Sequence, residues 1–108
     1  MPQFAVYQNR NFYSSQSFPL LVDVQSALLD ELGTRVVVPL ARAEARNDFV
    51  LRVLMPPVEL EGKRYVLMTP QITGLSRAVL GPMRGSLAAH ERAISMATDL
   101  LLRGFVAH

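Results

Sequence analysis

The sequence predicts a mainly β protein that ends in an α-helix. Short apolar runs, separated by glycines and prolines, fill most of residues 4–85, and this pattern is typical of strands joined by turns. From residue 86 the apolar residues recur at helical spacing. A length of 108 residues suits one domain, so we expect a single domain over 1–108. Its expected form is a small twisted sheet or open barrel with a helix attached.

Composition and charge argue for a folded protein and against several kinds of site. Half of the residues are apolar and 19% are charged, as in folded domains. The net charge is +2 without a run of lysine or arginine, so charge gives little support for direct nucleic-acid binding. The absence of cysteine excludes disulfides, thiolate zinc sites and thiol nucleophiles.

The sequence carries no signal for secretion or for a membrane. The opening residues, MPQFAVYQNRNFY, lack the basic start and apolar stretch of a signal peptide. No apolar run approaches the roughly 20 residues needed to cross a bilayer. We therefore expect a cytoplasmic protein without membrane contact. A dimer is also expected, because a domain of this size buries only roughly 60–70% of its surface on folding.

The N-terminal segment is predicted to form a strand and then a loop. Residues 4–8, FAVYQ, alternate like a strand that is buried on one face. The polar stretch 9–17 indicates a mobile loop. Its two aromatic residues, Phe12 and Tyr13, are unusual there. We expect them to fold back onto the domain, although they could instead wait for a partner.

A strand and a tight turn follow. Residues 20–25, LLVDVQ, alternate in the manner of a strand. Ser26 is placed to cap a short turn that Gly33 ends. Leu28 and Leu29 are adjacent within this turn, so one element cannot easily bury both of them. We expect one of the two leucines to be exposed.

The middle of the chain is predicted to supply four more strands, two of which form a hairpin. Residues 35–42 are a β-branched run in which Pro39 should mark an edge or a bulge, because proline donates no ladder hydrogen bond. Residues 49–70 are interpreted as two strands around Glu61–Lys63, where Gly62 suits a tight turn. Residues 74–85 indicate a further short strand with glycines along it.

The last element is predicted to be an amphipathic helix. Ser86 can cap a helix that runs from Leu87 to about Arg103. Its apolar residues share one face, which would pack on the sheet. Gly104 suits the left-handed position that ends many helices, and Phe105 would then contact the last turn.

No enzyme signature appears along the chain. The two histidines, His90 and His108, stand far apart, and no spacing of His, Asp and Glu supplies a metal site. The serines lack a nucleophile-elbow motif, and the glycines lack the pattern of a phosphate-binding loop. We therefore expect neither a catalytic residue nor a cofactor.

Five stretches and their order make the chain recognisable. They are QFAVY (3–7), LLVDVQSALLD (20–30), RVVVPLA (35–41), LEGKRYVLMTPQI (60–72) and the terminal helix that ends at Gly104. Together they resemble the CcdB family of bacterial toxins, over nearly the whole chain. The resemblance implies a mainly β fold with a C-terminal α-helix, built as an SH3-like barrel of the CcdB/MazF/Kid type.

The resemblance also implies a function. CcdB toxins are homodimers that bind the A subunit of DNA gyrase and trap it on cleaved DNA, so they are protein poisons and not enzymes. A CcdA-like antitoxin neutralises them with a disordered segment that folds on binding. Such pairs stabilise plasmids, and chromosomal copies also occur. The resemblance thus implies a toxin of a type II toxin–antitoxin system that uses no cofactor or metal.

The residues of both binding surfaces can be carried over from the family one by one. The implied gyrase-binding residues are Leu28, Leu29, Asp99, Leu102, Arg103, Gly104 and Phe105. The implied antitoxin-binding residues lie in the first loop and are Asn9, Arg10, Asn11, Phe12 and Tyr13.

Arg103 departs from the family pattern. The best-studied toxins carry a tryptophan at this position, and its indole stacks on a gyrase arginine, a contact worth about 0.5–2 kcal/mol. An arginine here places two like charges together against the same partner residue.

Two other hypotheses stay open. MazF/Kid toxins share the barrel and the dimer but cleave RNA with arginine, aspartate and other polar side chains, and the arginine-rich composition keeps this endoribonuclease activity possible. The chain could also be a non-toxic CcdB homologue that only binds an antitoxin, which the substitution at Arg103 motivates.

Overall fold

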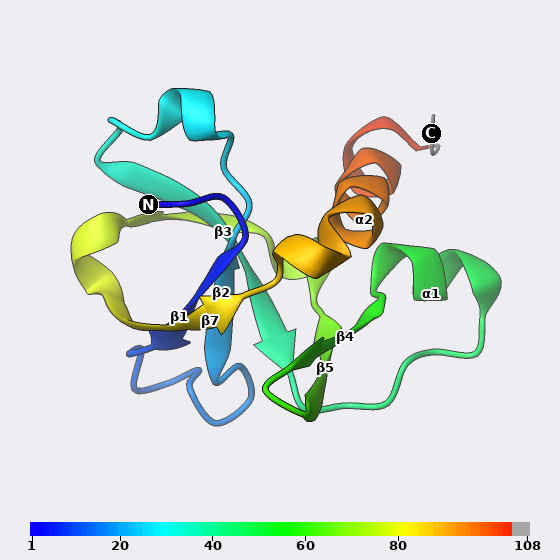
Figure 1. Cartoon of the computed structure of the whole chain (residues 1–108). Coiled ribbons are helices and arrows are strands. Elements are labelled where there is room, and N and C mark those ends of the chain that lie inside the picture. Colours follow the sequence, from blue (N-terminus) through cyan, green and yellow to red (C-terminus); the bar gives the residue numbers. More distant parts are fainter. Residues whose placement is uncertain (105–108) are drawn as a thin grey trace.

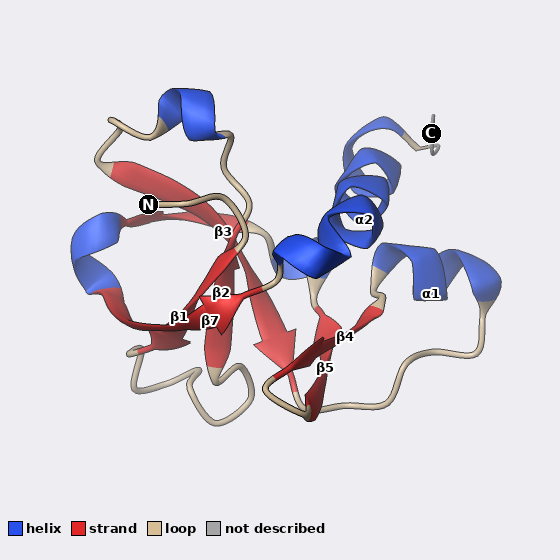
Figure 2. Cartoon of the chain, in the orientation of Figure 1, coloured by secondary structure: helices blue, strands red, loops and turns tan. Residues whose placement is uncertain are grey.

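The computed structural model describes residues 1–104. The strands form one curled sheet, and the two α-helices lie together on one side of it (Figures 1 and 2). Seven strands in this range pair in the order β4-β5-β3-β2-β1-β7, and β6 adds to β3. The strands are β1 Ala5–Asn9, β2 Leu20–Asp23, β3 Thr34–Ala41, β4 Pro57–Leu60, β5 Lys63–Leu67, β6 Thr73–Ser76 and β7 Leu80–Ser86. This curled sheet with a C-terminal helix confirms the predicted fold class.

Helical segments connect the strands and end the chain. The α-helices are α1 Phe49–Leu54 and α2 Glu91–Arg103. Four short 3₁₀ helices are η1 Ala27–Leu29, η2 Thr69–Gln71, η3 Arg77–Val79 and η4 Ala88–His90. Within residues 1–104, no helix is long and apolar enough to cross a membrane.

Strand alternation places apolar side chains on both faces of the sheet. In the antiparallel pair of β1 and β2, Val6 lies opposite Val22, and both belong to the cluster under α2. Their neighbours Tyr7 and Leu21 point to the other face and join a second, smaller cluster. A strand buried on both faces explains why the apolar runs at 4–8 and 20–25 are nearly continuous.

The helix α2 packs its narrow apolar side on the sheet. Ile94 and Ala97 are buried against the larger cluster together with Leu87. The predicted start at residue 87 is wrong, because the α-helix begins at Glu91. Ser86 does cap the segment, since its Oγ accepts from the Ala88 N–H at 3.1 Å. That cap starts the 3₁₀ turn η4, so a tighter turn precedes the α-helix.

Residues 49–54 form a helix, so the predicted strand at this place is wrong. Asp48 caps α1, because its carboxylate accepts from the Leu51 N–H at 3.1 Å. An apolar run of this length suits a strand and a helix equally well. Here the cap at Asp48 and the proline pair 56–57 that follows favour the helix. The helix α1 also packs against α2 (Figure 1).

Pro39 lies neither at an edge nor at a bulge, which corrects the expectation for this strand. It stands opposite Leu21 within a regular β2–β3 pairing. On its other side β3 changes partner: its pairing with β6 extends to Val37, and its pairing with β5 begins at Leu40. The Pro39 carbonyl accepts from Met68 N–H at 2.9 Å on that side. The missing N–H therefore falls in the gap between two partner strands, where no ladder bond is required.

The hairpin prediction is confirmed, and the last predicted strand divides in two. Glu61 and Gly62 join β4 to β5 with positive φ angles of 52° and 77°, the geometry of a type I′ turn. The segment 74–85 was expected to form one strand. It contains parts of β6 and β7 with the turn η3 between them.

A buried ion pair joins the two central strands. The Nε and Nη2 atoms of Arg35 on β3 both lie 2.8 Å from Oδ2 of Asp23 on β2. Both side chains are 0% exposed. Oδ1 of Asp23 accepts from the Gln25 N–H at 3.0 Å. Buried charges of this kind are stable only when paired and hydrogen-bonded.

Replacing Arg35 with methionine should destabilise the protein by about 3–5 kcal/mol, because it leaves the buried Asp23 carboxylate without its partner. Urea unfolding monitored by circular dichroism measures this change. The matched control is Arg46→Met at an exposed arginine, expected within about 0.5 kcal/mol of the wild type. Equal stabilities of the two variants would contradict the role given to the pair.

Candidate functional site

The turn η1 presents two leucines to solvent. Ser26 caps it, because its Oγ accepts from Leu28 N–H at 3.2 Å, and its carbonyl accepts from Leu29 N–H at 3.0 Å. Leu28 is 94% exposed and Leu29 is 50% exposed. The predicted cap is confirmed. Both leucines are exposed, however, where only one was expected, because three residues of 3₁₀ turn have no sheet face to cover them.

The end of α2 supplies the other half of the same surface. Leu102 is 73% exposed, and Arg103 beside it is also exposed. Asp99 lies one turn earlier and is partly exposed. Gly104 ends the helix in the left-handed conformation, and its N–H donates to the Leu100 carbonyl at 3.0 Å. The predicted helix stop is therefore confirmed, while Phe105 lies outside the described residues.

A groove joins the turn to the helix. Its volume is about 310 Å³, and Leu29 and Leu102 both line it. Its floor comes from apolar residues of the strands and of α2, among them Val24, Val36 and Ile94. The structure thus brings Leu29 and Leu102 to one groove, with Leu28 on the same turn. We call Leu28, Leu29, Leu102 and this groove the leucine surface.

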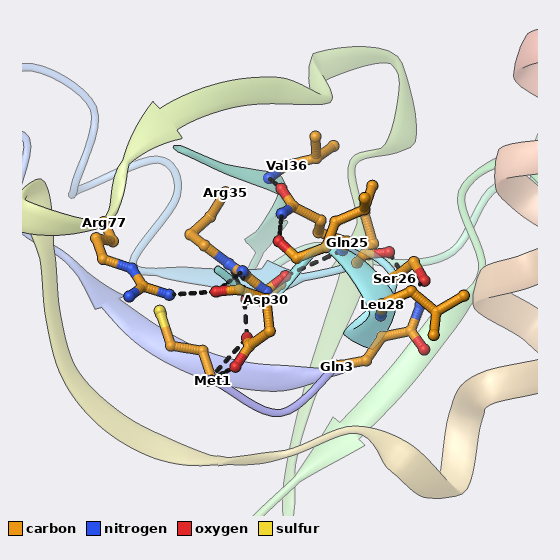
Figure 3. A network of polar contacts seen from close by, with 12 residues as sticks. Met1, Gln3, Gln25, Ser26, Leu28, Asp30, Arg35, Val36 and Arg77 are labelled. Atoms are coloured by element: carbon orange, nitrogen blue, oxygen red, sulfur yellow. Dashed lines mark hydrogen bonds and ion pairs between the residues drawn. The ribbon is translucent and has the colours of Figure 1, made fainter. Parts of the chain in front are cut away.

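Gln25 fastens the turn to the sheet (Figure 3). Its side-chain amide donates to the Leu29 carbonyl at 2.8 Å, and its Oε1 accepts from the Val36 N–H at 3.0 Å. The side chain is buried, so both bonds are shielded from water. Sequence reasoning missed this residue. Its signal was the polar pair Asp23 and Gln25 at alternate positions of an otherwise apolar strand.

A second group of contacts holds the far end of the turn. The backbone carbonyl of Asp30 accepts from Arg77 Nη2 at 2.9 Å, and Arg35 Nη1 lies 3.3 Å from the Asp30 carboxylate. The Met1 ammonium group donates to both carboxylate oxygens at 2.9 Å. That hydrogen bond, supported by the charges of Arg35 and Arg77, lowers the pKa of the Asp30 carboxyl. The Asp30 carboxyl therefore stays ionised to a lower pH than an ordinary aspartate does.

The first loop has a hydrogen-bonded conformation, and its mobility stays a prediction. Asn9 is buried, and its amide donates to Ser14 Oγ at 3.0 Å and to the Phe18 carbonyl at 2.7 Å. Its Oδ1 accepts from Asn11 N–H at 2.9 Å, and Asn11 Oδ1 in turn accepts from Tyr13 N–H at 2.8 Å. Two asparagines thus close the loop on itself.

The two loop aromatics do not fold back onto the domain, which corrects our expectation. Phe12 is 87% exposed and Tyr13 is 94% exposed. Their rings contact each other edge to face with centroids 5.5 Å apart. Arg10 is exposed beside them. This loop lies at the bottom of the view in Figure 1, whereas η1 and the end of α2 lie at the top. The structure therefore separates the two predicted sets of residues.

The histidines and acidic residues form no recognisable centre in the described part of the chain. Within residues 1–104, no three His, Asp or Glu side chains are grouped in a way that could hold a metal ion. His90 accepts a hydrogen bond from the Glu59 N–H at its Nε2, 3.3 Å away. It therefore packs beside the β4–β5 hairpin. His108 lies outside the described residues.

Comparison with known protein families gives one match of nearly full length. The family model described as CcdB protein matches residues 3–104. This range includes every strand and both α-helices, and it ends at the glycine that stops α2.

Replacing Gln25 with leucine should cost about 1–3 kcal/mol, because the Leu29 carbonyl and the Val36 N–H lose their buried partner. Amide hydrogen exchange should show faster exchange at Val36, and chemical denaturation gives the change in stability. The control is Gln16→Leu at an exposed position, expected within about 0.5 kcal/mol. Unchanged protection of Val36 in the Gln25 variant would show that the amide does not hold the turn.

Proposed function

The chain belongs to the CcdB family, which makes it a toxin of a toxin–antitoxin system, and we propose that its target is the A subunit of DNA gyrase. In this proposal the toxin of a type II system binds gyrase and traps the cleaved-DNA complex. A CcdA-like antitoxin neutralises it. The toxin acts as a protein poison of the topoisomerase and not as an enzyme, so no catalytic residue or cofactor takes part.

One observation carries the proposal: the turn η1 and the end of α2 both expose leucines on the leucine surface. Leu28, at 94% exposed, and Leu102, at 73% exposed, come from different elements beside one groove. Apolar surface gathered in this way marks protein-binding sites on soluble proteins. Each leucine that a partner buries completely contributes about 1.5–3 kcal/mol to binding.

Arg103 would decide which gyrase the toxin fits. It stands beside Leu102 at the end of α2, where the best-studied family members carry tryptophan. A guanidinium group is attracted by a carboxylate or by an aromatic face and is repelled by another arginine. We therefore propose a gyrase that presents an acidic or aromatic residue to Arg103. Asp99, Gly104 and Phe105 complete the proposed gyrase-binding set.

The proposed active form is a homodimer, with one domain over residues 1–108 in each copy, and it acts in the cytoplasm. Two copies would lay their terminal helices side by side, so that the two leucine surfaces form one larger binding face. The exposed Leu102 at the end of α2 supports this arrangement, because two such helix ends side by side would extend one apolar face.

The antitoxin is proposed to contact the first loop through Asn9, Arg10, Asn11, Phe12 and Tyr13. The exposed pair of aromatic rings supports this proposal, because aromatic side chains are common anchors at protein interfaces. Asn9 is buried, so it would contribute indirectly by holding the loop in place through its hydrogen bond to the Phe18 carbonyl.

Purified protein incubated with gyrase, ATP and supercoiled plasmid should trap cleaved DNA, detected as linear plasmid after denaturation with detergent. Leu28→Asp should weaken trapping by about 30-fold or more, because a charge replaces an apolar contact at the centre of the surface. Val50→Asp is the matched control, since Val50 is an exposed apolar residue of α1. It should trap as well as the wild type.

Other outcomes of the assay would favour the two other hypotheses. Defined fragments from labelled RNA in a parallel reaction without gyrase would replace the proposal with an endoribonuclease activity. A wild-type protein that neither binds gyrase in a pull-down nor traps cleaved DNA would be a homologue that only binds an antitoxin.

A further inference from the structure

A pocket of about 330 Å³ at the end of the molecule opposite the leucine surface gathers basic side chains. Arg42 follows β3, Lys63 begins β5 and Arg84 lies on β7, and all three line this pocket. The hairpin of β4 and β5 and the first loop both lie at the bottom of Figure 1. We call Arg42, Lys63, Arg84 and the pocket between them the basic pocket.

Close packing of two edge strands brings these cations together. The ideal Cβ position of Gly85 on β7 lies 2.9 Å from Leu60 Cδ1 on β4, so β7 runs close to the end of the β4–β5 hairpin. Arg84 on β7 and Lys63 on β5 therefore line the same pocket, although three strands separate β5 from β7 in the sheet order.

The three cations have no partner within the described part of the chain. No ion pair found among residues 1–104 involves Arg42, Lys63 or Arg84. One carboxylate, that of Glu61, also lines the pocket. Three positive charges against one negative charge leave an excess of two. Like charges held together repel each other, and a bound anion would relieve that repulsion.

The surroundings limit how far an anionic ligand could extend. Tyr65 is buried and lines both this pocket and a neighbouring one of about 460 Å³. The neighbouring pocket carries Glu44 and Glu59 beside Arg52 and Arg64, so its acidic and basic side chains balance. A long polyanion such as a nucleic-acid strand would run from the basic pocket onto a surface without excess positive charge. A short acidic segment, with two or three carboxylates, would stay among the cations.

We propose that the basic pocket binds the carboxylates of a short acidic segment of a partner polypeptide. Asn9 lines the pocket and also anchors the loop that carries Phe12 and Tyr13. The loop that carries the aromatic pair therefore borders the basic pocket, which suits a peptide that combines apolar and acidic residues. If the proposed function holds, the partner is the antitoxin, whose acidic segment would dock away from the leucine surface.

The test uses fluorescein-labelled hexaglutamate as the probe and follows its anisotropy with the full chain at about 50 mM salt, where charge interactions are weakly screened. The wild type should bind hexaglutamate and not hexaglutamine. The variant Arg42→Gln/Lys63→Gln/Arg84→Gln should weaken binding by about tenfold or more. The control Arg46→Gln/Arg52→Gln/Arg92→Gln has the same net charge but leaves the pocket intact, and it should change binding by less than about threefold.

Three results would overturn the proposal. They are no binding of hexaglutamate by the wild type, equal losses in the two triple variants, or tighter binding of a short single-stranded RNA through the same three residues. The last result would make the pocket a nucleic-acid site.

A gyrase-trapping assay on the same proteins keeps this proposal separate from the proposed function. The pocket variant should still trap cleaved DNA at the wild-type level, because the leucine surface is untouched. Peptide binding without any trapping by the wild type would remove gyrase as the target and leave the pocket standing. Trapping without peptide binding would leave gyrase as the target and remove the pocket as a peptide-binding site.

Discussion

The buried ion pair between Asp23 and Arg35 is the interaction on which the candidate site depends. It joins β2 to β3 at 2.8 Å with both side chains out of solvent. Asp23 also holds the Gln25 N–H, and the side chain of Gln25 then clamps the turn through the Leu29 carbonyl. Leu28 can be almost wholly exposed because polar bonds, and not its own burial, fix the turn. A binding surface that is held in this way loses little conformational entropy when a partner binds.

The fold keeps its two proposed binding surfaces apart. The turn η1 and the end of α2 lie at one end, where both line one groove, and the first loop and the β4–β5 hairpin lie at the other (Figure 1). β3 connects them, because it pairs with β6 near the turn and with β5 near the hairpin. In a toxin of this family, such separation would let an antitoxin hold one end while gyrase is still bound at the other. The antitoxin would then begin to displace gyrase from a complex of all three proteins.

Local chemistry explains which features the sequence could predict. The hairpin at Gly62, the cap at Ser26 and the helix stop at Gly104 each depend on neighbouring residues, and all three are confirmed. The position of Pro39 depends on where β3 exchanges one partner strand for another, which is set by distant residues. The partners of Gln25 and the exposure of Phe12 are tertiary properties as well. The apolar run at 49–54 fitted two kinds of element, and only a cap and its packing on α2 decide between them.

The claim that the leucine surface is the gyrase-binding surface can be tested most directly by hydrogen–deuterium exchange. The protein would be compared with and without an excess of the gyrase A subunit. The account predicts slower exchange in residues 26–32 and 98–104, with no change in the hairpin at 57–67. Slower exchange in the hairpin at 57–67 would contradict it. Unchanged exchange in both 26–32 and 98–104 while gyrase is bound would contradict it as well.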